Sequence, residues 1–259
     1  MKKLFMTLCA AMVVAVSVQA EGEPSKCCKH ASPYQKYTQD LPFSMPEVKA
    51  PVFPDNEVNL ADFGAVGDGS QLCTDAFAKA VDALSQLGGG KLVVPSGVWL
   101  TGPVVLKSNI NLHLEMGAVI QFAADESLYP LIDTSFEGLD TRRCQSPLSA
   151  KGATNIAVTG RGVIDGNGQY WRPVKKGKVT ASHWKSLLEI PGSVESKKGY
   201  WVPSEGYAKA EQKADMNVVK ASSEAEWNSY KRFLRPVMVS FVSCKNVLLQ
   251  GVIFQNSPA

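Results

Sequence analysis

Acidic side chains, the groups best suited to general acid and base catalysis, are scattered along this chain of 259 residues. Asp62, Asp68 and Asp165 lie close to glycines, and Asp75 lies at the start of a predicted helix. In such places a carboxylate accepts hydrogen bonds from turn amides or interacts favourably with the helix dipole. No Asp-Asp pair occurs in the sequence. We therefore expect structural roles for these four aspartates and assign no catalytic residue.

Residues that bind metals or cofactors do not form a recognisable set. His30, His113 and His183 are far apart, and Cys27 and Cys28 are adjacent rather than separated by two residues as in zinc sites. The two glycine-rich stretches lack the spacing of nucleotide-binding loops. The sequence therefore predicts no metal and no cofactor.

A segment spanning residues 169–236 concentrates basic and aromatic side chains. Between Arg172 and Arg235 there are thirteen Lys and Arg against seven Asp and Glu, whereas the whole chain carries a net charge of +3. Lysines attract acidic polymers, and tryptophan faces can stack on sugar rings. The alternative is a solvated insertion whose tryptophans fill a small core.

Short strands must position these residues. Asn109, Asn155 and Asn246 each begin an apolar strand, and a turn with glycine follows the two later copies. The first two copies are 46 residues apart, which suits two coils of roughly 20 to 25 residues in a β-solenoid. Stacked coils bury an apolar face that one coil cannot bury alone, and the asparagines would stack at equivalent turns. A β-sandwich, the alternative, favours hairpin turns such as Asn-Gly, which occurs only at position 167.

Four regions follow from these patterns. Residues 1–20 have the basic start, apolar core and small final residues of a signal peptide, and the apolar core is too short for a membrane span. We expect an exported protein, periplasmic or extracellular, without a membrane span; export also argues against nucleic acid as a partner. Residues 21–57 form a leader, and residues 58–259 form an incomplete parallel β-helix domain interrupted by the insertion 169–236.

Two helices are predicted within this all-β domain. The first covers Thr74 to Leu87, with Thr74 as N-cap and Gly88 in the left-handed conformation after its end, and it caps the first coil. It follows a predicted strand, Val58 to Phe63. The second covers Glu224 to Leu234 within the insertion, where Ser223 has the position of an N-cap.

Several motifs together resemble one family. They are Asp62-Phe63-Gly64-Ala65, Gly67-Asp68-Gly69, Gly88-Gly89-Gly90, Val93-Val94-Pro95-Ser96-Gly97, Leu100-Thr101-Gly102-Pro103, Gly162-Val163-Ile164-Asp165-Gly166-Asn167-Gly168 and Gly251-Val252-Ile253-Phe254-Gln255-Asn256-Ser257-Pro258. The chain resembles the N-terminal portion of glycoside hydrolase family 28, the polygalacturonases and rhamnogalacturonases, which are right-handed parallel β-helices. The resemblance implies an exported enzyme that hydrolyses galacturonan or rhamnogalacturonan with inversion.

The family's catalytic motifs are absent from this chain. In the family, an Asn-x-Asp run, an Asp-Asp pair, a Gly-His-Gly-like segment and an Arg-x-Lys segment follow a stretch like Asn256-Ser257-Pro258. None of the four occurs here, so the resemblance places the catalytic residues beyond Ala259. A polysaccharide lyase or epimerase on the same scaffold, and a non-catalytic glycan-binding β-helix, stay open as alternatives.

The resemblance also suggests a ligand for the basic segment, because pectin carries a carboxylate on each galacturonate unit. We predict that the segment contributes to binding this acidic polysaccharide. The candidate substrate-binding residues are Trp171, Lys175, Lys176, Trp184, Lys197, Lys198 and Trp201.

We predict that the chain of 259 residues has no pectin-hydrolysing activity of its own, because inversion needs a positioned acid and base. The measurement is the release of reducing sugars from polygalacturonate by the purified protein. Hydrolysis above the rate of a heat-inactivated sample would contradict this expectation.

Overall fold

A computed structural model describes residues 34–46, 48–216 and 218–259, which fall into two compact units, Met1–Val48 and Lys49–Ala259. The predicted signal peptide lies outside the described residues, as do Cys27 and Cys28. In the first unit the described part of the predicted leader contains a short 3-10 helix, η1 (Gln35–Tyr37). Among the described residues, none of the helices has the length and apolar character needed to cross a bilayer.

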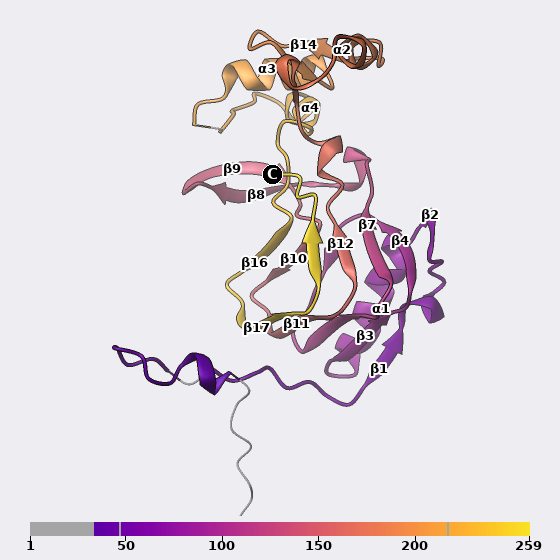
Figure 1. The fold of residues 1–259 in the computed structure, drawn as a ribbon, viewed down its shortest axis with the longest axis vertical. Coiled ribbons are helices and arrows are strands. Elements are labelled where there is room, and N and C mark those ends of the chain that lie inside the picture. The colour runs from indigo at the N-terminus through magenta and orange to yellow at the C-terminus, as the bar shows by residue number, and fades with distance from the viewer. Residues whose placement is uncertain (1–33, 47, 217) are drawn as a thin grey trace, which may run out of the picture. The chain divides into compact units, whose positions relative to one another are not determined.

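The second unit is a parallel β-helix in which the strands of successive coils pair side by side (Figure 1). The first sheet has the order β1 (Glu57–Asn59), β3 (Gly90–Val94), β6 (Ile110–Leu114), β11 (Thr154–Gly160) and β17 (Lys245–Gln250). The second has the order β16 (Val239–Val242), β10 (Leu148–Lys151) and β5 (Val104–Val105). The third has the order β18 (Ile253–Gln255), β12 (Val163–Asp165), β7 (Ala118–Phe122), β4 (Gly97–Thr101) and β2 (Asp68–Leu72). The predicted all-β, right-handed parallel β-helix is confirmed.

The core of the β-helix follows from the two-residue alternation of its strands. In β6, Ile110, Leu112 and Leu114 point inward and are fully buried, whereas Asn111 and His113 point outward and are half-buried. The neighbouring strands repeat this pattern in register, so that the apolar side chains of one coil cover those of the next.

The spacing of 46 residues between the asparagine repeats is one coil, not the two that the sequence suggested. Strand β6 pairs directly with β11, so that Ile110 lies beside Ile156. This coil is lengthened by η3 (Glu126–Leu128) and by an antiparallel hairpin, β8 (Leu131–Phe136) and β9 (Leu139–Cys144). No pattern in the sequence indicated this hairpin.

The asparagine repeats form a continuous ladder along the β-helix. Asn155 Nδ2 donates to Asn109 Oδ1 (3.0 Å), and Asn246 Nδ2 donates to Asn155 Oδ1 (2.9 Å). All three have positive φ angles, 61°, 54° and 54°, a conformation in which asparagine is favoured among residues with a side chain. The predicted stacking of these residues is therefore confirmed, and each turn is tied to the next by a side-chain amide.

The first helix, α1 (Thr74–Gln86), packs its apolar side against the first coils, as predicted. The prediction that Thr74 is the N-cap is wrong, because Cys73 occupies that position. Thr74 Oγ1 instead accepts a hydrogen bond from Gly102 N (2.7 Å), which links the helix to the residues after β4. Gly88 has φ +88°, as expected after the helix end.

The strand predicted for 58–63 ends at Asn59. The Asn59 side chain accepts a hydrogen bond from Ala61 N and so begins the 3-10 helix η2 (Leu60–Phe63).

The insertion is more regular than its sequence indicated, and it lies at one end of the sheets in Figure 1. It contains η4 (Gly168–Tyr170), β13 (Val174–Lys175), η5 (Lys176–Lys178), α2 (Ala181–Leu188), β14 (Val194–Glu195), β15 (Tyr200–Val202), α3 (Glu205–Lys213) and α4 (Glu224–Ser229). The three strands make a small antiparallel sheet with β15 in the centre. The helix predicted to run to Leu234 ends at Ser229, while Ser223 caps it as expected by accepting from Glu226 N (3.2 Å).

We predict that Asn155→Ala lowers the free energy of unfolding by about 2–4 kcal/mol, because it removes two amide contacts and places a Cβ-bearing residue without compensation at positive φ. Asn155→Gly loses the same contacts but adopts this φ without steric cost, so its loss should be about 1 kcal/mol smaller. Urea unfolding followed by circular dichroism measures both. If Asn155→Ala had the same free energy of unfolding as the wild type, the asparagine ladder would contribute nothing to stability.

Candidate functional site

Three tryptophans of the predicted binding set lie inside the protein. Trp171 is fully buried, with its ring edge-on to Tyr129 (5.1 Å between centroids). Trp184 and Trp201 are each 7% exposed, and Trp201 Nε1 donates to Leu187 O of α2 (2.7 Å). Stacking on a sugar requires an exposed ring face, so we do not retain these tryptophans as stacking residues. Their burial matches the alternative that they fill a small core.

The four lysines of the predicted set are all exposed on the insertion. Lys175 lies over the ring of Tyr200 (5.5 Å from Nζ to the centroid), and Lys176 lies between the ring of Trp184 (5.3 Å) and Glu195 Oε1 (3.6 Å). Lys198 Nζ is 3.9 Å from Glu211 Oε1. Among the described residues Lys197 has no ion pair. The structure thus brings Lys175 and Lys176 close to β15 and leaves their ammonium groups accessible to an anion.

Acidic groups in the insertion partly offset this charge. Glu226 accepts from Lys213 Nζ (2.5 Å), Ser222 N (2.6 Å) and the Tyr230 hydroxyl (2.6 Å). These contacts, with the lysine contributing most, hold the pKa of Glu226 well below its usual range. Glu226 therefore stays ionised and fastens α4 to α3 rather than serving as an acid catalyst.

A polar row on the third sheet was not recognised in the sequence. Gln121, Asp165 and Gln255 lie side by side on β7, β12 and β18, and the row ends at the apolar Leu100 of β4. Gln121 and Asp165 alternate with buried residues of their own strands, so that the row faces outward. The signal in the sequence was a polar residue in corresponding positions of successive strands.

Asp165 links two coils within this row. Its Oδ1 accepts from Asn167 N (2.8 Å), which is the turn contact that the sequence predicted. Its Oδ2 accepts from Gln255 Nε2 and Asn256 Nδ2, both at 2.8 Å. The neighbours of Asp165 in the row are glutamines rather than a second acid, so the row can orient sugar hydroxyls but supplies no acid–base pair.

The remaining aspartates of the sequence analysis have local roles. Asp68 Oδ1 accepts from Ser70 N (2.8 Å) and Gln71 N (3.0 Å), and these backbone contacts lower its pKa. Asp62 and Asp75 lie in the first turns of η2 and α1. Turn and helix-start positions therefore account for these residues, as expected.

Buried titratable groups join the hairpin to the end of the insertion. The Arg143 guanidinium donates to Arg235 O (2.9 Å from Nε). Burial lowers the pKa of Arg143 to about 10. Burial also raises the pKa of the Cys144 thiol to about 12. A thiol with this pKa is a poor nucleophile at neutral pH, so this cluster is structural. Among the described residues, no group of histidine, cysteine and acidic side chains is arranged to hold a metal ion.

Comparisons with known proteins find relatives among proteins named as polygalacturonases. No family model matches the chain. A probable polygalacturonase from Vitis vinifera is 39% identical over 125 residues, which cover 45% of this chain and 26% of the relative. An exo-poly-α-D-galacturonosidase from Dickeya chrysanthemi is 36% identical over 119 residues, which cover 43% of this chain and 19% of the relative.

A solved structure extends this likeness to most of the fold. The crystal structure of an exopolygalacturonase from Thermotoga maritima matches 82% of this chain and 44% of its own, with 35% identity and a TM-score of 0.57. The chain is thus related to the polygalacturonases of glycoside hydrolase family 28, as its motifs indicated. It spans about a quarter or less of the two curated relatives and under half of the solved structure.

We predict that Trp171→Ala lowers the free energy of unfolding by about 3–5 kcal/mol, because it leaves a large cavity beside Tyr129. Trp171→Phe should cost less, since it keeps an aromatic ring there and removes an indole N–H that has no hydrogen-bond partner among the described residues. Thermal unfolding of both variants, with the exposed Lys175→Ala as control, checks this. A nearly unchanged midpoint in Trp171→Ala would contradict a core role.

Proposed function

We propose that this chain serves pectin degradation as the N-terminal, recognition part of a glycoside hydrolase of the polygalacturonase type, an enzyme that acts on galacturonan or rhamnogalacturonan by inverting hydrolysis. The observation that carries the proposal is the likeness to the Thermotoga maritima exopolygalacturonase over 82% of the chain. Two curated relatives named for action on galacturonan support it. Export through residues 1–20 to the periplasm or the extracellular space is part of this proposal, because pectin lies outside the cell that degrades it.

In this proposal the described residues provide recognition rather than bond cleavage. The β-helix is a rigid support because its coils are tied by backbone pairing and by the asparagine ladder. The exposed lysines of the insertion, Lys175, Lys176, Lys197 and Lys198, attract the carboxylates of the polymer. Surface charge of this kind mainly raises the rate at which protein and polymer associate, and salt screens this attraction.

The test of the proposal compares two uronide polymers of equal charge density with one neutral polymer. Binding of the purified chain to de-esterified polygalacturonate is measured at low salt by co-sedimentation, beside polyguluronate and neutral galactan. The proposal expects polygalacturonate to bind more tightly than both. Preference for polyguluronate would favour the alternative of an alginate-directed lyase or epimerase.

We predict that replacing Lys175, Lys176, Lys197 and Lys198 by Ser weakens polygalacturonate binding about tenfold at low ionic strength, since each exposed charge contributes a few tenths of a kcal/mol. Raising the salt concentration to about 0.5 M should remove most of the difference between variant and wild type.

The matched control replaces Lys49, Lys79, Lys151 and Lys245, which are also exposed but lie outside the insertion. It changes the net charge equally, so it should lower the affinity clearly less than the insertion variant does. Equal losses in the two variants would show that only the total charge of the protein matters, and an unchanged affinity would leave the insertion without a part in binding.

A further inference from the structure

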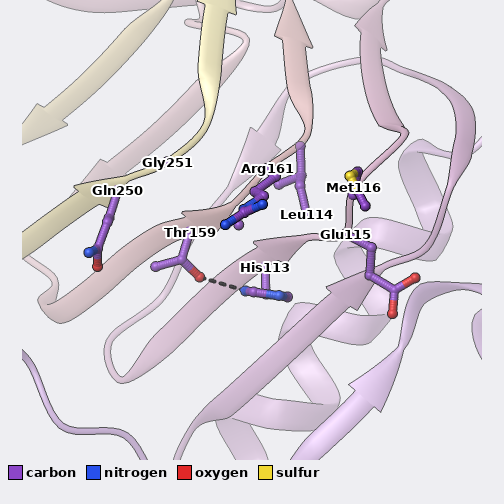
Figure 2. Close-up of a pocket in the computed structure, with 9 residues that line it drawn as sticks. His113, Leu114, Glu115, Met116, Thr159, Arg161, Gln250 and Gly251 are labelled. Atoms are coloured by element: carbon purple, nitrogen blue, oxygen red, sulfur yellow. Dashed lines mark hydrogen bonds between the residues drawn. The ribbon is translucent and has the colours of Figure 1, made fainter.

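An open groove of about 590 Å³ lies on the outer face of the first sheet (Figure 2). The polar row around Asp165 belongs to the third sheet, which is a different one. Its centre is one register row of three strands, His113 on β6, Thr159 on β11 and Gln250 on β17. The turns that follow these strands add Glu115, Met116 and Arg161 to its wall. Neither the sequence motifs nor the proposed recognition by the insertion uses these residues.

The floor of the groove is held rigidly by the stacking of the coils. Gly160 has φ +108°, and a Cβ there would lie 1.9 Å from Leu114 O, so only glycine fits. This close approach lets Arg161 N donate to Leu114 O (3.0 Å). The backbone that carries Arg161 is therefore fixed relative to β6, and its side chain starts from a defined point beside His113.

A chain of hydrogen bonds favours one tautomer of the neutral His113 ring. Thr159 Oγ1 donates to Asn111 Oδ1 (2.8 Å) and also contacts His113 Nδ1 (2.8 Å). A hydroxyl has one hydrogen, and here it is used on Asn111, so His113 Nδ1 must carry a proton and donate to Thr159. In the neutral ring Nε2 is then an acceptor, and among the described residues it has no partner.

A cation lines the same groove as this acceptor. Arg161 is exposed and, among the described residues, makes no ion pair. The acid of the wall, Glu115, extends away from the other polar side chains in Figure 2. The groove therefore combines guanidinium donors, an imidazole acceptor and the apolar side chain of Met116, which is 74% exposed.

We propose that this groove is a second saccharide site that takes a uronate unit, whose carboxylate accepts from Arg161 while a ring hydroxyl donates to His113 Nε2. A sulfate ion has no hydrogen to donate to Nε2, and a neutral sugar offers the guanidinium only hydroxyl oxygens without a negative charge, so a sugar acid uses both groups most fully. The identity of the sugar acid as galacturonate rests on the proposed function. The site would hold a chain of pectin on a face of the β-helix different from the insertion.

The experiment titrates the full chain with trigalacturonate and follows the ring nitrogens of His113 by NMR. The proposal expects a saturable change at Nε2, with galactose and sulfate giving much weaker effects. Arg161→Gln should weaken the binding about fivefold, whereas Lys151→Gln, an exposed charge of β10, should leave it unchanged. Thr159→Val should also weaken it and shift the ring away from the Nδ1–H form, which the two nitrogen shifts report directly.

Several results would overturn the site: ring nitrogens that do not respond, equal affinity in Arg161→Gln, equal losses in the Lys151 control, or sulfate binding as tightly as trigalacturonate. If polygalacturonate still binds through the lysines of the insertion, only this second site is lost. If the wild-type chain binds no form of galacturonan, the proposed function fails as well.

Discussion

Each coil of this β-helix has an apolar inner face that only the next coil can cover, and the rest of the structure depends on this stacking. Leu112 of β6 lies between Leu92 and Val158, and all three are buried. Because parallel pairing places identical positions of successive coils side by side, any side chain that recurs forms a row. Rows of apolar side chains inside the β-helix form the core, and rows at the turns form the asparagine ladder. Rows on the outer face form polar strips such as the one around Asp165.

The parts of the fold that repeat were the parts that the sequence could predict. The recurrence of an asparagine before an apolar strand is explained by the solenoid. Each asparagine adopts a left-handed backbone conformation at the turn, and its side chain forms a hydrogen bond with the corresponding asparagine of the next coil. The β8–β9 hairpin was missed because its turn is Glu137-Gly138, both at positive φ, rather than the usual Asn-Gly or Asp-Gly. That omission is also why a single coil of 46 residues was interpreted as two.

In the insertion, residue type alone does not distinguish a sugar-binding surface from a small core. Tryptophan suits both a sugar-binding surface and a small core, and no local pattern in 169–236 distinguishes the two. The structure places Trp171, Trp184 and Trp201 inside and the neighbouring lysines outside, so that the aromatic residues hold the surface that presents the charge. Similarly, the position of His113 on a strand was predictable, but its bond to Thr159 depends on pairing between coils that only the fold supplies.

We propose that this chain recognises galacturonan through exposed polar groups on a stacked scaffold, and that its buried tryptophans serve only the core. A crystal structure of the chain with a bound oligogalacturonate tests this most directly. The account predicts ordered sugar units whose carboxylates contact surface cations of the insertion or of the first sheet, with Trp171, Trp184 and Trp201 still buried. Sugar rings stacked on any of these three tryptophans, or carboxylates bound without contact to a lysine or arginine, would contradict it.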